Sequence, residues 1–279
     1  MKKLTTAILA ATLSFPVMAT NTDNVRIGTG TEGGKYWEQG QQVSYLLKRK
    51  SINSEVLPSN GSVQNVEDLN DGDVDMIVVQ ADTLNVHPIN VSYTSRPVHK
   101  EYVLWLYNKK NGYKDIEDIE GSEDKLIVLV EDSGAVTTLQ SFVKEDGGYK
   151  TNLQKAIYAE TFYDAAEIVA DGKYEGKTVA GMLYVGGKVP KGDEGVTDFS
   201  NAIAVGEATD GDFNDAEDVN GDSLYTNCSV DKQHMGGLES GTLFSPDTVC
   251  LRAMIVSSKE HTQFKQMRRA VNKVSKRYN

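Results

Sequence analysis

The stretch that most constrains the fold is residues 25–37, which read VRIGTGTEGGKYW. Val25 and Ile27 are two positions apart, so both side chains can face one side of a sheet. The glycines that follow allow a tight turn and a close backbone approach to a bound molecule: Gly28, Gly30, Gly33 and Gly34. Apolar residues then recur at three- and four-residue spacing over 36–47, which predicts an amphipathic helix. The stretch therefore predicts a strand, a glycine turn and a helix whose free N–H groups attract anions.

A nucleotide site is one interpretation of this turn, because residues 28–33 match G-x-G-x-x-G. A dinucleotide-binding unit also needs an acidic residue at the end of the next strand. That strand, residues 54–59, ends in Pro58-Ser59 instead. No Lys-Ser or Lys-Thr pair follows the glycines, so a P-loop is excluded. The motif alone does not establish a nucleotide site.

The alternation of strands and helices that begins at residue 25 continues to residue 83. A second strand is predicted at 54–59, a helix at 63–69 and a buried strand at 75–80. The order β-α-β-α-β predicts an open parallel sheet covered by helices. Ligands of such sheets bind beyond the carboxyl ends of the strands. Three loops lie there, namely 29–36, 58–62 and 80–83.

A second unit follows the polar stretch 108–124. Its strands are predicted at 126–130, 156–159 and 179–187, and its helices at 136–143 and 162–170. Before it lies a strand at 98–106, and after it a strand at 248–257 and a terminal helix at 262–276. We expect two lobes: residues 20–105 plus about 206–279 form the first, and residues 106–205 form the second.

The first 19 residues have the features of a secretory signal peptide. Lys2 and Lys3 precede a short apolar run, and Val17-Met18-Ala19 is a cleavage site. A membrane anchor is the alternative, but threonines and a serine interrupt a run already too short to span a bilayer. Cleavage after Ala19 leaves 279 − 19 = 260 residues. We expect an exported, periplasmic protein without direct membrane insertion.

The charge of the chain excludes some partners. The formal net charge is −11, and loss of Lys2 and Lys3 makes it −11 − 2 = −13. So acidic a protein repels nucleic acid and anionic membranes. No cofactor is predicted.

Cys228 and Cys250 are the two cysteines of the chain, and in an exported protein they predict one disulfide. Without a nearby histidine pair they do not predict a zinc site. Asp210 and Asp212 begin like a calcium loop, but Asp215 and Gly221 occupy positions that require glycine and glutamate. The acidic stretch 206–222 is therefore expected to be a solvated loop, with other calcium geometries open.

Five segments together resemble a known family: I-G-T-G-x-x-G-G-x-Y at 27–36, N-G-S-V-x-N-V at 60–66, D-G-D-V-D-M-x-x-V-Q-A-D at 71–82, V-E-D-S-G-A-V-T-T at 130–138 and Y-V-G-G at 184–187. They are similar to segments of the TAXI-type solute-binding proteins of tripartite ATP-independent periplasmic (TRAP) transporters. The resemblance implies a type II periplasmic-binding-protein fold, with two α/β lobes closing on a small solute.

The resemblance also implies a function. Solutes of the family are small organic anions and amino acids, glutamate among them, and the partner is a membrane permease driven by an ion gradient. Two features depart from the family pattern. Glu32 brings a negative charge into the first loop, and the region 206–247 is unusual.

The glycine turns that follow strand ends predict a ligand site between the lobes. Lys35 could supply a cation, and Tyr36 or Tyr184 a flat wall with a hydroxyl. Tyr36 could instead be a core aromatic and Lys35 a solvated lysine, while Ser62, Ser133 and Thr137 could simply cap helices. The predicted ligand-binding residues are Thr31, Gly33, Gly34, Lys35, Tyr36, Ser59, Asn60, Gly61, Ser62, Gln80, Ala81, Asp82, Ser133, Gly134, Ala135, Val136, Thr137, Tyr184 and Gly186.

Two other functions are considered. Ser62 and Ser133 stand at turns before helices, as nucleophilic serines can, but no G-x-S-x-G motif surrounds either residue. A secreted hydrolase is therefore disfavoured, and no enzyme activity is predicted. A binding fold reused for signalling or adhesion, without a permease, is the other alternative.

Overall fold

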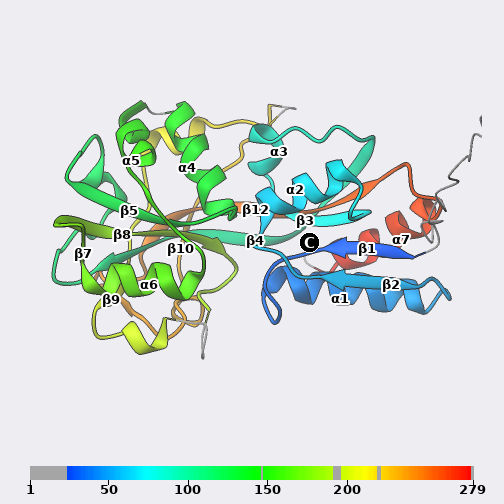
Figure 1. Ribbon diagram of the computed structural model, residues 1–279, viewed down its shortest axis with the longest axis horizontal. Helices are drawn as coiled ribbons and strands as arrows, with labels where there is room; N and C mark the ends of the chain where they lie inside the picture. Colours follow the sequence, from blue (N-terminus) through cyan, green and yellow to red (C-terminus); the bar gives the residue numbers. More distant parts are fainter. Residues whose placement is uncertain (1–23, 146, 191–195, 219–220, 278–279) are drawn as a thin grey trace, which may run out of the picture.

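The computed structural model describes residues 24–145, 147–190, 196–218 and 221–277. The signal peptide expected at residues 1–19 lies outside this part of the chain. Figure 1 shows two halves joined by two long strands, β4 (Tyr93–Asn108) and β12 (Asp247–Ser258). Within the described residues, none of the helices combines the length and the apolar character needed to cross a bilayer.

The first half of the molecule contains the β-α-β-α-β unit predicted from the sequence. Its three short strands are parallel and lie in the order β2-β1-β3. The strands are β1 (Val25–Gly28), β2 (Ser54–Leu57) and β3 (Met76–Gln80). The helices are α1 (Lys35–Lys48), α2 (Ser62–Asp71), α3 (Thr83–Val86) and the C-terminal α7 (Phe264–Ser275).

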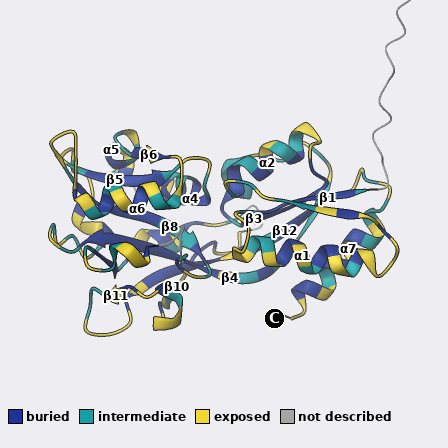
Figure 2. Cartoon of the chain, turned by 60° about the horizontal axis from the view of Figure 1, so that its bottom comes forward, coloured by how far each residue is buried: buried dark blue, intermediate teal, exposed yellow. Residues whose placement is uncertain are grey.

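The helices cover both faces of this sheet because its strand β3 is apolar on both sides. Met76 and Val78 pack in one hydrophobic cluster with residues of α1 and α7. Ile77 and Val79 point the other way and pack with residues of α2. Side chains alternate between the two faces of a strand, so a continuous apolar run of this kind needs cover on both faces. Figure 2 shows the strands dark blue between helices with exposed outer stripes.

The second half repeats the topology of the first. Its parallel strands lie in the order β6-β5-β8, so again the first strand of the unit is central. The main elements are β5 (Lys125–Val130), α4 (Gly134–Glu145), α5 (Lys150–Gln154), β6 (Ile157–Ala159), α6 (Phe162–Asp171) and β8 (Lys177–Gly186). Smaller strands are β7 (Lys173–Tyr174), β9 (Ile203–Gly206), β10 (Thr226–Ser229) and β11 (Glu239–Ser240). Short 3₁₀ turns are η1 (Ile116–Ile119), η2 (Gly147–Tyr149), η3 (Thr197–Phe199), η4 (Gly211–Asp215) and η5 (Lys232–His234).

The long strand β4 belongs to both halves. Its first part, 93–101, pairs with β12, which in turn pairs with β3. Its last part, 102–107, pairs with β8. The strands therefore form one hydrogen-bonded path, β2-β1-β3-β12-β4-β8-β5-β6. The sequence analysis did not anticipate this continuity, because nothing in it placed β12 between β3 and β4.

Residues of the segment 208–225 pack with the second half. Ala208, Phe213 and Tyr225 pack in a hydrophobic cluster of the second half. Phe213 stacks on Phe142 of α4, with 3.4 Å between the ring centroids. The expectation of a solvated loop at 206–222 is therefore wrong for Phe213, which is buried. Burial of these aromatic residues attaches the segment to the second half. We therefore propose that one lobe contains about residues 24–100 and 252–277, and the other about residues 101–251. They are called the first half and the second half below.

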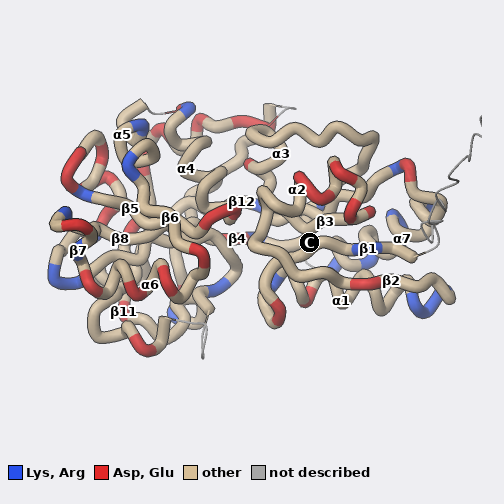
Figure 3. The backbone as a smooth tube through the Cα atoms, viewed as in Figure 1, with Lys and Arg blue, Asp and Glu red and all other residues tan. Residues whose placement is uncertain are grey.

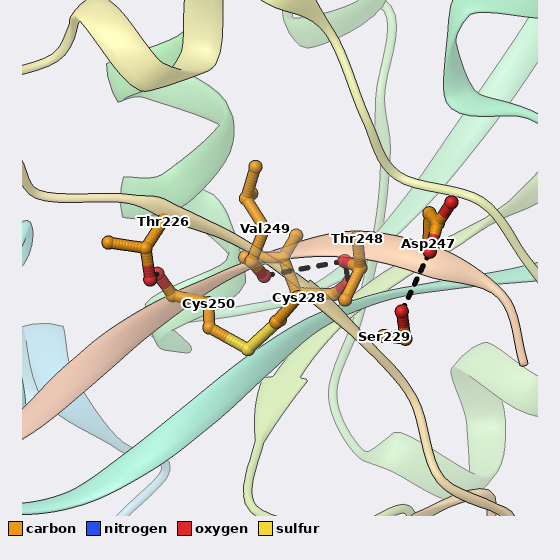
Figure 4. Close-up of a disulfide and its surroundings, with 8 residues drawn as sticks. Thr226, Cys228, Ser229, Asp247, Thr248, Val249 and Cys250 are labelled. Atoms are coloured by element: carbon orange, nitrogen blue, oxygen red, sulfur yellow. Dashed lines mark hydrogen bonds between the residues drawn. A yellow bond between two sulfur atoms is a disulfide. The ribbon is translucent and has the colours of Figure 1, made fainter.

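The predicted disulfide is present. Cys228 on β10 and Cys250 on β12 are bonded, with 6.0 Å between their Cα atoms (Figure 4). The two strands are adjacent and antiparallel, and Thr226 pairs with Cys250. The bond therefore fastens the edge strand β10 to a strand that runs through both halves.

Candidate ligand site between the two halves

The helices α2 and α4 begin opposite one another, one in each half. A Cβ atom built on Gly61 would lie 3.6 Å from Ser133 Cα. A Cβ atom built on Gly134 would lie only 1.7 Å from Gln80 Oε1. Gly61 also has φ 134°, a conformation that residues with a side chain rarely adopt. The end of the Gln80 side chain therefore occupies the space beside Gly134, and the backbone conformation of Gly61 favours glycine.

Of the serines at these two turns, Ser62 does not cap its helix. The N-cap of α2 is Gly61, which has no side-chain cap, so neither Ser62 nor Asn60 caps the helix. Ser62 Oγ instead accepts a hydrogen bond of 3.1 Å from the backbone N–H of Gln80. Ser133 Oγ donates to the backbone oxygen of Val130 at 2.7 Å. Ser62 thereby fixes the end of β3 next to the start of α2.

Asp82 connects the two halves. Its Oδ2 accepts hydrogen bonds from Thr138 Oγ1 at 2.7 Å and from the Tyr225 hydroxyl at 2.8 Å, both in the second half. The residue is fully buried, and its other oxygen, Oδ1, has no hydrogen-bond partner. Burial raises the pKa of Asp82 to about 6, against the lowering effect of these two hydrogen bonds and of the Thr83 backbone N–H.

A second buried carboxylate, that of Glu101, also lies where the two halves meet; this region is called the junction below. The Tyr36 hydroxyl donates to Glu101 Oε2 at 2.9 Å, and His99 Nε2 lies 3.4 Å from Glu101 Oε1. Gln39 Nε2 lies 3.2 Å from His99 Nδ1, so helix α1 and strand β4 share one polar network. Burial, and then the charge of Glu101, raise the pKa of Tyr36 well above its ordinary value. The same two causes, burial and then the charge of Glu101, raise the pKa of Tyr184 on β8.

The predicted residues of the first loop lie at the surface. Thr31, Gly33, Gly34 and Lys35 are exposed, and a Cβ atom on Gly33 would meet nothing within 4 Å. Lys35 Nζ is 2.8 Å from Glu38 Oε2 on the same helix.

The stem of Lys35 nevertheless faces the second half. A Cβ atom built on Gly187 would lie 3.7 Å from Lys35 Cγ. The first loop thus lies near the end of β8, beside Tyr184 and Gly186. A Cβ atom on Gly186 would lie 2.7 Å from the Tyr184 hydroxyl.

The remaining predicted residues have structural contacts. Ser59 Oγ donates to the backbone oxygen of Thr29 at 2.6 Å, and Asn60 is exposed. Ala81, Ala135 and Val136 are apolar and pack with the hydrophobic cluster of the second half.

The predicted residues that have contacts where the two halves meet are Tyr36, Gly61, Ser62, Gln80, Asp82, Ser133 and Gly134. Their placement in a ligand site stays a prediction.

Several polar residues of the junction were missed by the sequence analysis: Gln39, His99, Glu101, Thr138 and Tyr225. Glu101 offered a signal in the sequence, because this charged residue directly precedes the apolar run of β4. In the structure its side chain is 1% exposed. Tyr225 offered none, since it lies in a loop region more than 140 residues from Asp82, its hydrogen-bond partner.

The junction holds buried side-chain oxygens that no described group satisfies. Besides Asp82 Oδ1, these are Gln39 Oε1, Gln80 Oε1, Thr83 Oγ1 and Thr137 Oγ1. Buried polar atoms in proteins are normally hydrogen-bonded, so each of these oxygens calls for a partner such as water or a bound molecule. Among the described residues, neither Asp82 nor Glu101 forms an ion pair with a lysine or arginine. Figure 3 shows that Asp and Glu occur over both halves.

Two hollows of about 400 and 420 Å³ lie elsewhere on the surface. One is lined by residues such as Tyr158 and Tyr174, the other by residues such as Arg26 and Asp75. No predicted site residue lines either hollow. In the part of the chain that the structure covers, no group of three or more His, Cys, Asp or Glu side chains is placed to hold a metal ion.

Two parallel α/β units joined by long shared strands define the type II periplasmic-binding-protein fold. Solved structures with this fold align with nearly the whole chain. The chain belongs to the NMT1-like family, whose sequence model matches residues 27–188. The TAXI subtype suggested by the sequence motifs is a finer assignment and stays a prediction.

Three of the similar structures illustrate the fold. An ancestral arginine-binding protein bound to arginine has 12% identity and a TM-score of 0.52, covering 91% of this chain and 93% of its own. A substrate-binding protein of an ABC uptake transporter from Streptococcus pneumoniae, with bound histidine, has 13% identity and a TM-score of 0.52, covering 92% and 88%. A putative L-cystine ABC transporter from Listeria monocytogenes has 13% identity and a TM-score of 0.50, covering 90% of each chain.

At these identities the likeness concerns the fold. The proteins named are transport and binding proteins rather than enzymes. Curated protein sequences gave no match.

Proposed function

We propose that this protein is an extracytoplasmic solute-binding protein that captures a small amino acid or organic anion between its two halves. The observation that carries the proposal is the junction itself. Side chains from both halves meet there at the carboxyl ends of the central strands, and buried oxygens there lack partners. Ligands of open α/β sheets bind at such places. The structures with bound arginine and histidine share this fold and support the proposal.

Binding would work by closure of the two halves about β4 and β12. These strands run through both halves, so a change of their twist or bend would move one half relative to the other. A solute that contacts both halves favours the closed arrangement by its differential affinity. The beginnings of α2 and α4 suit its carboxylate, because helix N-termini attract anions.

The destination of the solute is a membrane permease. The sequence motifs favour a TRAP-type permease, whereas two of the structural neighbours belong to ABC transporters. We propose the TRAP type on the strength of the motifs at 27–36 and 71–82. Transport by cells carrying this protein with each class of permease would separate the two. Export through a cleaved signal peptide at residues 1–19 is part of the same proposal.

The test is a thermal-shift screen of the purified protein against amino acids and di- and tricarboxylates, followed by calorimetric titration of the best solute. Gly134→Val is the informative variant, because the nearest atoms to its added Cβ all belong to Gln80 in the other half. The change should obstruct closure while leaving each half folded, and should weaken binding at least roughly 10-fold.

Gly211→Val is the matched control, since a Cβ atom at Gly211 meets nothing within 4 Å. It should bind like the wild type. Wild-type protein that no solute stabilises, or a Gly134→Val variant that binds as well as Gly211→Val, would contradict the proposed site.

A further inference from the structure

Charge is divided unevenly between the two halves. The first half, residues 24–100 and 252–277, contains 15 Lys and Arg and 10 Asp and Glu, a net charge of 15 − 10 = +5. The second half, residues 101–251, contains 12 Lys and Arg and 29 Asp and Glu, a net charge of 12 − 29 = −17. The acidity of the whole chain therefore arises in the second half, and the first half is basic.

Helix α7 presents much of this positive charge on its outer face. Its apolar residues, Met267 and Val271 among them, are buried in a hydrophobic cluster of the first half. The residues at the opposite positions of the helix are exposed, and the segment 261–277 contains no Asp or Glu. Positions three and four apart lie on one side of a helix, so the charges form a single stripe. The exposed cations of α7 and of the two residues after it are Lys265, Arg268, Arg269, Lys273, Lys276 and Arg277.

The end of helix α1 adds three exposed cations, Lys48, Arg49 and Lys50. Helices α1 and α7 pack next to one another in the same hydrophobic cluster (Figure 2). Helix α1 ends shortly before β2 begins, and α7 begins shortly after β12 has passed Met76, the first residue of β3. The end of α1 and the start of α7 therefore lie at the same edge of the sheet, opposite the edge that leads to the junction. The three cations of α1 and the six of α7 are called the basic face below.

The carboxylates of the chain do not neutralise the basic face. In the part of the chain that the structure describes, none of its cations forms an ion pair. The Arg268 guanidinium lies 5.9 Å from the centre of the Phe264 ring, and Arg269 Nη1 donates to Gln266 Oε1 at 3.4 Å. These partners are uncharged, so the positive charge of the face is left to attract anions from outside.

The composition of the basic face fits the headgroups of a membrane better than another macromolecule. The core of a protein–protein interface is depleted in charged residues, whereas this face is charged along its length. A head-to-tail contact with the acidic half of a second copy would produce open chains. A nucleic acid that extended along the molecule would meet the net charge of −17 on residues 101–251, since that charge follows from 12 − 29. Repulsion between the second half and a lipid surface falls off within about 8 Å at physiological ionic strength.

We propose that the basic face binds the anionic headgroups of a phospholipid membrane, and that the protein lies at that surface with its first half toward the lipid. The contact is peripheral, because Lys and Arg side chains reach the phosphates and no segment of the chain enters the bilayer. The second half is repelled and points away. The repulsion of anionic membranes that was expected from the net charge then applies to the second half alone. The inference does not depend on the solute, and it goes beyond the proposed function.

The test is co-sedimentation of the purified protein with two kinds of vesicle. One kind contains phosphatidylcholine alone, and the other contains equal parts of phosphatidylcholine and phosphatidylglycerol. The protein should partition onto the anionic vesicles at least roughly 10-fold more strongly, and the difference should shrink as salt is added. Equal partition onto both kinds, or onto neither, overturns the inference and leaves the proposed function standing.

A triple variant, Arg268→Gln with Arg269→Gln and Lys273→Gln, assigns the binding to the basic face. Glutamine is about as good a helix former as arginine or lysine, so the variant should keep α7. Each Lys or Arg near an anionic surface contributes roughly 5-fold to binding, so partition onto the anionic vesicles should fall roughly 100-fold. Undiminished partition of this variant overturns the inference.

The matched control is Lys144→Gln with Lys150→Gln and Lys173→Gln. These three lysines are exposed in the second half, and their replacement makes the same change in net charge. The control should bind the anionic vesicles within roughly 3-fold of the wild type, because its cations lie away from the lipid. A control that loses as much binding as the triple variant of α7 overturns the inference, since net charge alone would then explain the result.

Two further measurements compare the other occupants of the face. Self-association in analytical ultracentrifugation without vesicles, if the triple variant of α7 abolishes it, makes the basic face an interface between copies and overturns the inference. A DNA duplex that binds as tightly as the anionic vesicles overturns the preference for lipid. If the triple variant does not fold, Lys48→Gln with Arg49→Gln and Lys50→Gln takes its place and should show the same loss.

Discussion

The stability of the protein should depend on pH through Asp82, and Asp82→Asn should remove that dependence. Burial raises the pKa of this carboxyl to about 6 in the folded protein, from an ordinary value of 3.8. The folded state therefore holds the proton more tightly than the unfolded chain does. The contribution of the protonated group to stability is fully present below about pH 4 and is lost as the pH rises through 6.

The size of the effect follows from the shift. A difference of about two pKa units corresponds to about 3 kcal/mol between the protonated and ionised forms. Asp82→Asn carries no charge at any pH, so it does not lose this contribution. Its added amide donor would be buried at the place of Oδ1, at a cost of about 1–3 kcal/mol that does not vary with pH. The informative quantity is therefore the difference in the free energy of unfolding between variant and wild type, and how that difference changes with pH.

The assay is urea unfolding of both proteins, without solute, at intervals from about pH 4 to pH 7.5. The free energy of unfolding of Asp82→Asn, relative to wild type, should rise by about 2–3 kcal/mol over this range. Asp198→Asn is the control, because Asp198 is exposed on the turn η3, and its difference from wild type should stay nearly constant. A relative stability of Asp82→Asn that changes by less than about 0.5 kcal/mol would refute the reasoning that a buried charge at the junction is costly.

Three further outcomes are expected. Replacing both Cys228 and Cys250 by serine should lower stability by about 3 kcal/mol, since the bond spans a separation of 22 residues, and two thiols titrating in the unfolded, unreduced wild type would disprove the bond. Gly34→Val should weaken solute binding without unfolding the protein, because its Cβ would lie 2.9 Å from the Thr31 backbone oxygen and displace the first loop; equal calorimetric affinity would remove that loop from the site. Ser133→Ala should cost about 1 kcal/mol of stability through loss of its hydrogen bond to the backbone, and an unchanged unfolding midpoint would count against that role.

The sequence was sufficient for the local elements because their signals are local. Two-residue alternation at Val25 and Ile27 predicted β1, and three- and four-residue spacing predicted α1. Gly72 follows the last apolar residue of α2 and ends the helix in the left-handed conformation, as glycine commonly does there. The strand–turn–helix order of the second half was visible in the same way at Val130–Ser133 and the helix that follows. Periodicity and turn chemistry depend on neighbours in the chain, so one sequence suffices to read them.

The sequence by itself thus determined the class of each unit, the disulfide between Cys228 and Cys250, and the turns near which a ligand site was sought. Only the tertiary structure decided that β12 lies between β3 and β4, and that Phe213 and Tyr225 pack in the second half. It alone brought Asp82 to Thr138 and Tyr225, residues far apart in the chain. The physical reason is that strand pairing and burial are long-range choices. They depend on which apolar faces cover one another, and the spacing of residues along the chain does not show which faces these are.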